Sequence, residues 1–290
     1  MIKYLTFAVS LLLMIAFMPH FSEVMQQRAS LVKLGFVPKG ELYKAVVGSF
    51  RWFEGEYYTF RSIVYYGSKV KAVMKRRYNE IEYYNLYQTL KAAIILNPYN
   101  EDAYYFAQAA LAWDARQVKA AIKLLEYVYK YRPWDFQIPF FLGFDYGYFL
   151  HDYKKAGEYY RDAANLTHAS LFVNLAAKYL YEGGDTESAI IYLKYMISQT
   201  RNKNIKKIYQ KRLNALLKVE FLQKAVEKYK TKFGKKPASL KELIDAGIIE
   251  KIPEDPYGGR FYITKNGKIE TTSKLAEGWR HGSNTSNEFK

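Results

Sequence analysis

Three similar helical phrases recur in the middle of the chain and restrict the folds that it can adopt. Ala121, Ala156 and Ala189 occupy equivalent places in them, with separations of 35 and 33 residues. The phrases read VKAAIKLLEYVYKYRP, YKKAGEYYRDAANL and TESAIIYLKYMI, and another predicted helix precedes each, at residues 104–113, 140–150 and 171–181. A fixed period of this length predicts helix pairs that stack side by side and bury their apolar faces against one another.

The period resembles that of the tetratricopeptide repeat, a helix–turn–helix unit of about 34 residues. The residues that carry the resemblance are Leu142, Gly143, Tyr146, Ala156, Tyr160 and Ala163 in one unit and Ala176, Ala177, Leu180, Ala189, Leu193 and Met196 in the next. The chain departs from the repeat in that no Trp opens the first helices. The resemblance implies a mostly α fold with a tetratricopeptide-like solenoid at residues 68–218. A generic helical bundle is the alternative.

In such a solenoid the first helices of the pairs form a concave wall. The resemblance implies a groove for a protein partner there, lined by Tyr105, Phe140, Phe144, Tyr148, Asn174, Lys178 and Tyr181. Aromatic side chains favour binding because rigid rings give contact area at little entropic cost. The chain has 29 Tyr, however, so any surface would carry some rings by chance.

An apolar run at residues 4–18 contains only two polar side chains, Thr6 and Ser10. No small-residue cleavage site follows it, so we expect an uncleaved signal anchor at residues 1–22 that contacts the membrane through residues 4–21. A cleaved signal peptide and a buried core helix are the alternatives. Lys3 precedes the run, which favours a single-pass protein of a bacterial inner membrane with its body in the periplasm, although basic residues also follow the run.

Residues 23–67 connect this segment to the predicted repeats and are rich in aromatic residues, with Arg51, Trp52 and Phe53 in succession. Two interpretations fit the pattern. The segment is a divergent helix pair that caps the solenoid, or it is an interfacial anchor of the kind that Trp, Tyr and Arg form beside membrane segments. We expect a juxtamembrane helical cap with the membrane surface close by.

The pattern changes at residue 219 and predicts a small α+β module over residues 219–275, followed by a flexible tail at 276–290. A helix ends near Gly234, and Asn266-Gly267 predicts a two-residue turn in a β-hairpin. The module resembles the C-terminal domain of the major pseudopilins of type II secretion through Tyr229, Gly234, Pro237, Leu240, Leu243, Ile252, Pro253, Asp255, Pro256, Tyr257, Gly258 and Tyr262. That resemblance implies a calcium site near Asp255, but too few carboxylates accompany it.

Since the N-terminal methylation motif is absent, we do not expect the chain to be a pilin. Its whole layout is similar to membrane-anchored tetratricopeptide proteins of bacteria.

The chain carries 44 Lys and Arg against 28 Asp and Glu, a formal charge of +16. One predicted basic patch comprises Lys203, Lys206, Lys207, Lys211 and Arg212. Such a patch is a solvated face, a surface for anionic lipid or polysaccharide, or a nucleic-acid site. Export would keep the protein from most nucleic acid, so nucleic acid is the least favoured partner.

The sequence holds no motif typical of an enzyme. It has no Cys and only four scattered His, and we find no phosphate-binding loop, nucleophile elbow or zinc-protease motif. We therefore expect no catalytic residue, no metal and no cofactor. The prediction is a non-enzymatic scaffold that binds a protein partner in an envelope assembly for secretion, type IV pilus-like fibres or surface polymer export. The alternative is a nucleic-acid-binding protein, for example in DNA uptake.

Overall fold

The computed structural model describes residues 2–27, 34–74, 81–264 and 266–275. It forms two compact units, residues 1–115 and 116–290. Both units are built mainly from helices, and the second also contains a two-stranded sheet. The prediction of a mostly α fold with a small α+β end is thus confirmed. The predicted flexible tail at 276–290 lies outside the described residues.

The first element, helix α1 (Ile2–Gln27), covers the predicted anchor. Its side chains between Tyr4 and Phe21 are exposed wherever they are described, with Tyr4 at 83 % and Phe17 at 69 %. Within the described part of the chain, no helix combines the length and the apolar character that crossing a bilayer requires. The membrane-crossing segment expected at residues 4–21 is therefore not confirmed.

The rest of the N-terminal unit is a small helical assembly. It contains α2 (Gly40–Val47), η1 (Gly48–Phe50), α3 (Arg51–Met74), α4 (Tyr83–Leu96), α5 (Glu101–Gln108) and the π-helical η2 (Ala109–Asp114). Helices α2 and α3 both pack on α4, and Tyr58 meets Ala93 and Leu96 in their shared core. Glu56 of α3 accepts hydrogen bonds from the side-chain amides of Asn97 and Asn100, at 2.7 and 2.6 Å.

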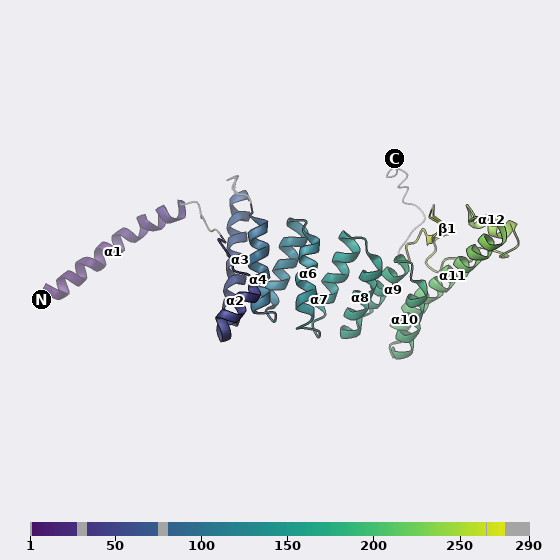
Figure 1. Ribbon diagram of the computed structural model, residues 1–290, viewed down its shortest axis with the longest axis horizontal. Helices are drawn as coiled ribbons and strands as arrows, with labels where there is room; N and C mark the ends of the chain where they lie inside the picture. Colours follow the sequence, from purple (N-terminus) through teal and green to yellow (C-terminus); the bar gives the residue numbers. More distant parts are fainter. Residues whose placement is uncertain (1, 28–33, 75–80, 265, 276–290) are drawn as a thin grey trace. The chain divides into compact units, whose positions relative to one another are not determined.

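The second unit continues with helices that follow one another side by side in chain order (Figure 1). They are α6 (Val118–Tyr129), α7 (Gln137–Phe144), the π-helical η3 (Asp145–Phe149), α8 (Tyr153–Thr167), α9 (Ser170–Glu182), α10 (Thr186–Gln199) and α11 (Lys203–Phe233). Each of α7, α8, α9 and α10 packs against the helix before it and the helix after it. The three repeat alanines, Ala121, Ala156 and Ala189, are all buried.

The backbone repeats with the same period as the sequence. Arg116, His151 and Gly184 have positive φ angles of 55°, 54° and 87°, and each stands two positions before α6, α8 or α10 begins. Their separations equal those of the three alanines. Asp152 and Asp185 follow two of them and accept hydrogen bonds from the backbone N–H groups of Lys155 and Ser188, which caps α8 and α10. Equivalent turns therefore start the second helix of each predicted pair.

The C-terminal part adds α12 (Leu240–Asp245) and the antiparallel strands β1 (Phe261–Ile263) and β2 (Ile269–Thr271). The predicted two-residue hairpin turn is wrong. The backbone N–H of Thr264 donates to the carbonyl of Lys268 at 2.9 Å, so three residues lie between the closing pair. Gly267 is the last of the three and has φ +80°, as a three-residue loop requires at that place.

Two predicted domain boundaries fall inside helices. Helix α3 continues through residue 67 to Met74, and α11 continues through residue 218 to Phe233. Gly67 stands at the first boundary but keeps a helical backbone, and the change of pattern at residue 219 contains no residue that ends a helix. Helix α11 ends where Gly234 adopts φ +71° and donates its N–H to the carbonyl of Lys230.

Gly157 offers a test of the close packing of α8 on α9. A Cβ at this position would lie 2.8 Å from the backbone nitrogen of Leu180, so the helices would have to separate. We expect Gly157→Ala to lower the free energy of unfolding by about 1–3 kcal/mol. Gly67→Ala is the matched control, since Gly67 is also helical but no described atom lies within 4 Å of its Cβ position. The control should gain up to about 1 kcal/mol. Urea unfolding followed by circular dichroism measures both, and a stabilised Gly157→Ala would contradict the packing.

Candidate partner-binding surface

An aromatic stripe follows α7 and η3. It consists of Phe136, Phe140, Phe144 and Tyr148, which are spaced by four residues and so lie on one side of the helix. Phe144 and Tyr148 stack with ring centroids 5.1 Å apart and planes at 22°. Phe136 is 40 % exposed and Tyr148 56 % exposed, so the ends of the stripe meet solvent.

The buried side of the stripe packs against α9. Phe172 of α9 is buried, and its ring centroid lies 5.9 Å from that of Phe136 and 5.7 Å from that of Phe140. Phe140 also contacts Tyr160 of α8 at 6.4 Å. Rings that are packed on one side and open on the other lose little conformational freedom when a partner binds.

Three of the seven residues predicted for the groove, Phe140, Phe144 and Tyr148, are brought together by this stripe. The sequence analysis missed Phe136, which the four-residue spacing would have revealed. Tyr105, also predicted, lies on α5 of the N-terminal unit and is 54 % exposed.

Helix α9 supplies the predicted polar residues of the groove. Asn174 donates its side-chain amide to the carbonyl of Ser170 at 3.0 Å. Its Oδ1 atom is buried and has no hydrogen-bond partner within the described residues. Lys178, four positions on, forms an ion pair with Glu182 at 3.7 Å. The Asn174 acceptor is therefore enclosed by the protein itself and is not open to a partner.

The prediction that Tyr181 lines an open groove is wrong. Tyr181 is only 6 % exposed and donates its hydroxyl to the backbone carbonyl of Ile269 in β2 at 2.7 Å. Burial is the main cause that raises the pKa of Tyr181 above its ordinary value, and the nearby Glu270 carboxylate adds to it. The phenol therefore stays a neutral donor that ties the hairpin to α9.

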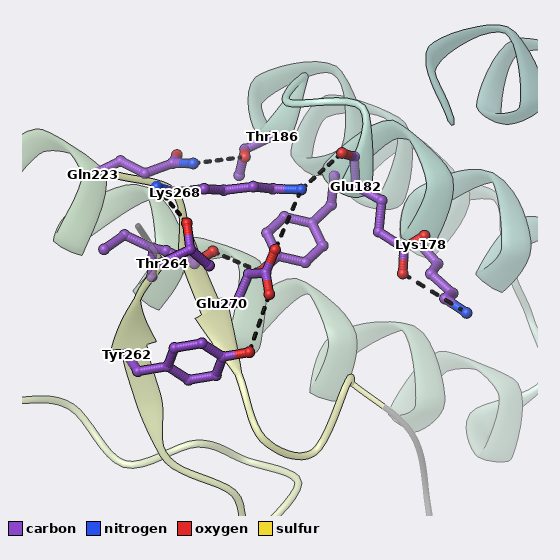
Figure 2. A network of polar contacts seen from close by, with 10 residues as sticks. Lys178, Glu182, Thr186, Gln223, Tyr262, Thr264, Lys268 and Glu270 are labelled. Atoms are coloured by element: carbon purple, nitrogen blue, oxygen red, sulfur yellow. Dashed lines mark hydrogen bonds and ion pairs between the residues drawn. The ribbon is translucent and has the colours of Figure 1, made fainter. Parts of the chain in front are cut away.

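A polar network completes this attachment (Figure 2). Lys268 extends its Nζ to the backbone carbonyl of Glu182, at 2.7 Å, and to the Glu270 carboxylate, at 3.9 Å. Tyr262 donates its hydroxyl to the same carboxylate at 3.0 Å. A cavity of about 330 Å³ lies beside these groups, and it is lined by the side chains of both the hairpin and α9. We call this set of contacts the hairpin latch.

A cluster of tyrosines joins α6 to η3 and α8. Tyr146 and Tyr159 stack at 5.6 Å and both donate to Glu126, at 2.9 and 3.2 Å. Tyr129 donates to Asp162 at 3.3 Å. Burial and then the charge of Asp162 raise the pKa of Tyr129 to about 12. These phenols act as neutral donors between helices.

The predicted basic patch is smaller than expected. Lys203 and Lys207 are exposed and Lys206 is half-buried. Lys211 lies over the ring of Tyr257, with its Nζ 4.7 Å from the centroid. Arg212 is buried and donates to the carbonyl of Leu275 at 2.7 Å. The guanidinium therefore lies in the core between α11 and the end of the C-terminal module, where Leu275 contacts it.

The carboxylate of Asp255, where the resemblance implied calcium, accepts hydrogen bonds from donors of the protein itself. Its Oδ2 accepts the hydroxyls of Thr271 and Ser273, and its Oδ1 accepts the N–H of Tyr257 at 2.8 Å. Among the described residues, no group of three or more acidic or His side chains is placed to hold a metal ion.

Comparisons with models of protein families and with curated proteins give no match to this chain. The resemblances to the tetratricopeptide repeat and to the pseudopilin domain therefore stay predictions.

The raised pKa of Tyr129 predicts a loss of stability in alkali. Between pH 10 and about 12 the phenol ionises in the unfolded chain but resists ionisation in the folded one. The unfolded state then binds fewer protons, so the free energy of unfolding falls as pH rises, by at most about 1.4 kcal/mol per pH unit for one group. We expect Tyr129→Phe to show a shallower decline in urea titrations above pH 10. Tyr195→Phe, at a 58 % exposed position, removes a hydroxyl elsewhere and serves as the control. Identical slopes in both variants would refute the assignment.

The hairpin latch predicts local protection of the sheet. We expect Lys268→Met to speed amide hydrogen exchange in β1 and β2 about fivefold or more, since a lost hydrogen bond costs on the order of 1 kcal/mol. Exchange in α6 and α7 should not change. Lys251→Met replaces an exposed lysine of the same module and serves as the control. Unchanged exchange of the hairpin would show that the latch does not hold it.

Proposed function

We propose that this chain is a membrane-anchored scaffold that acts by binding a protein partner rather than by catalysis. In this proposal the helix pairs form a tetratricopeptide-like solenoid, α1 anchors the chain in a bilayer, and the pseudopilin-like module offers a docking surface. The assembly served is one of the bacterial envelope, for secretion, pilus-like fibres or surface polymer export.

The repeated turns support the solenoid. Positive φ angles recur at Arg116, His151 and Gly184 with the same separations as the repeat alanines. Such a coincidence is expected of stacked copies of one supersecondary unit. In a generic helical bundle, turns of the same conformation are not expected to recur at a constant separation in the sequence.

The single observation that carries the binding role is the aromatic stripe. Phe136, Phe140, Phe144 and Tyr148 form a row of rings that is packed against α9 on one side and open at Phe136 and Tyr148. Aromatic anchors held in this way dominate the binding energy of protein interfaces.

The exposed apolar side chains of α1 support anchoring. Among the described side chains of this helix, eleven large hydrophobic ones from Tyr4 to Phe21 are exposed to solvent. Water does not favour such a surface, whereas the hydrocarbon of a bilayer does. We propose the bacterial inner membrane, with the body of the protein in the periplasm. Retention in the membrane pellet after a carbonate wash tests the anchoring. Protease treatment of intact spheroplasts tests whether the body of the protein lies in the periplasm.

Site-specific photocrosslinking in cells tests the binding surface. We expect a photoreactive phenylalanine analogue at Phe144 or Tyr148 of the full chain to give the same discrete adduct. The analogue at Tyr195, an exposed position on α10, should give none. Once the adduct identifies the partner, Tyr148→Ala should weaken its binding about tenfold or more, since truncation of an anchor ring costs roughly 2 kcal/mol. Equal crosslinking at all three positions would contradict a specific surface.

A further inference from the structure

Helix α3 is apolar on two opposite faces. One face, with Tyr58 and Tyr65, is buried in the N-terminal unit. On the other face Phe50 of η1 is followed along α3 by Phe53, Tyr57, Phe60 and Val64, at spacings of three and four residues. These five side chains are exposed by 74, 68, 45, 64 and 41 %. We call them the outer stripe.

The outer stripe is unusual for a helix at the end of a helical array. End helices carry a polar outer face, because no further helix covers them and the surface must stay soluble. Here the spacing that makes a helix amphipathic occurs twice around α3, once toward α4 and once toward solvent. Helix α2 adds Leu42 and Val46, which are four residues apart and 68 and 82 % exposed.

Cations accompany the rings. The Cζ atom of Arg51 lies 4.6 Å from the ring centroid of Trp52, and that of Arg61 lies 5.6 Å from the centroid of Tyr57. Trp, Tyr and Arg combine an apolar body with a polar or charged tip, so they favour the headgroup region of a bilayer. The guanidinium of Arg51 also suits anionic lipid.

The chain length ties this stripe to α1. Leu34 is 1 % exposed, and Arg61 donates to its carbonyl at 2.7 Å, so Leu34 is fixed to α3. Helix α1 ends at Gln27. The seven peptide steps from Gln27 to Leu34 extend at most about 25 Å. Once α1 is inserted in lipid, Leu34 stays within about 25 Å of the end of α1, and this short tether gives the stripe a high effective concentration at the membrane surface.

We propose that the outer stripe of α3 binds the headgroup region of an anionic bilayer and holds the N-terminal unit against the membrane. This inference rests on the proposed anchoring by α1. It goes beyond that proposal because it assigns a second, peripheral lipid contact to a helix that also packs in the folded unit.

Spin labels measure this contact directly, because the chain has no Cys of its own. Single variants Phe53→Cys and Phe60→Cys of the full chain are labelled and reconstituted in phosphatidylethanolamine–phosphatidylglycerol vesicles. Collision rates with oxygen, which partitions into lipid, are compared with those of a water-soluble nickel complex. Tyr84→Cys and Tyr105→Cys are exposed controls in the same unit, and Leu12→Cys reports on α1.

We expect the oxygen-to-nickel ratio at Phe53 and Phe60 to exceed that at Tyr84 and Tyr105 severalfold, and to fall when vesicles lack phosphatidylglycerol. A water-like ratio at both stripe positions with a lipid-like ratio at Leu12 overturns this inference and leaves the anchor intact. Water-like ratios at all sites overturn both. Labels at Phe53 and Phe60 that neither reagent reaches indicate a second copy or another protein on the stripe, which also overturns the inference.

Discussion

Close approach between neighbouring helices of the second unit depends on residues that have no side chain. A Cβ at Gly157 would lie 2.8 Å from the backbone of Leu180, and one at Gly147 would lie 2.8 Å from the ring of Tyr179. At Gly183 it would meet the backbone nitrogen of Lys154 at 2.8 Å. All three contacts join α9 to the preceding pair. They set how near α9 stands to α8 and η3, and therefore how Phe172 supports the aromatic stripe.

Tyrosine supplies the polar contacts that this packing allows. Its ring fills the space between two helices like an apolar side chain, and its hydroxyl reaches a carboxylate or carbonyl at the edge. Tyr146 and Tyr159 do so with Glu126, and Tyr181 does so with Ile269. Burial raises the pKa of all three phenols and keeps them neutral. A large number of Tyr residues is thus a structural property of the fold, and only those with one open side are free to bind.

Features that depend on neighbours in the sequence could be predicted. The 35- and 33-residue separations of the alanines predicted repeated helix pairs, and turns with positive φ recur with those separations at Arg116, His151 and Gly184. The aromatic residues of α7 fell on one side as expected. Features that depend on distant residues could not. The contact of Tyr181 with Ile269 joins residues 88 positions apart, and that of Arg212 with Leu275 joins residues 63 apart. No periodic pattern records such pairs, so both side chains looked exposed.

The hairpin latch limits where the proposed partner can bind on this unit. Since β2 and Lys268 cover Tyr181 and the carbonyl of Glu182, the C-terminal end of α9 is occupied by the chain itself. Of the predicted groove in this unit, the aromatic stripe stays open at Tyr148, and Phe136 extends it. A ligand that needed the whole inner wall of a solenoid would have to displace the hairpin and break the bonds of Tyr181 and Lys268. A short helix or extended segment that covers only α7, η3 and the start of α9 meets no such cost, so the proposed function favours a partner of that size.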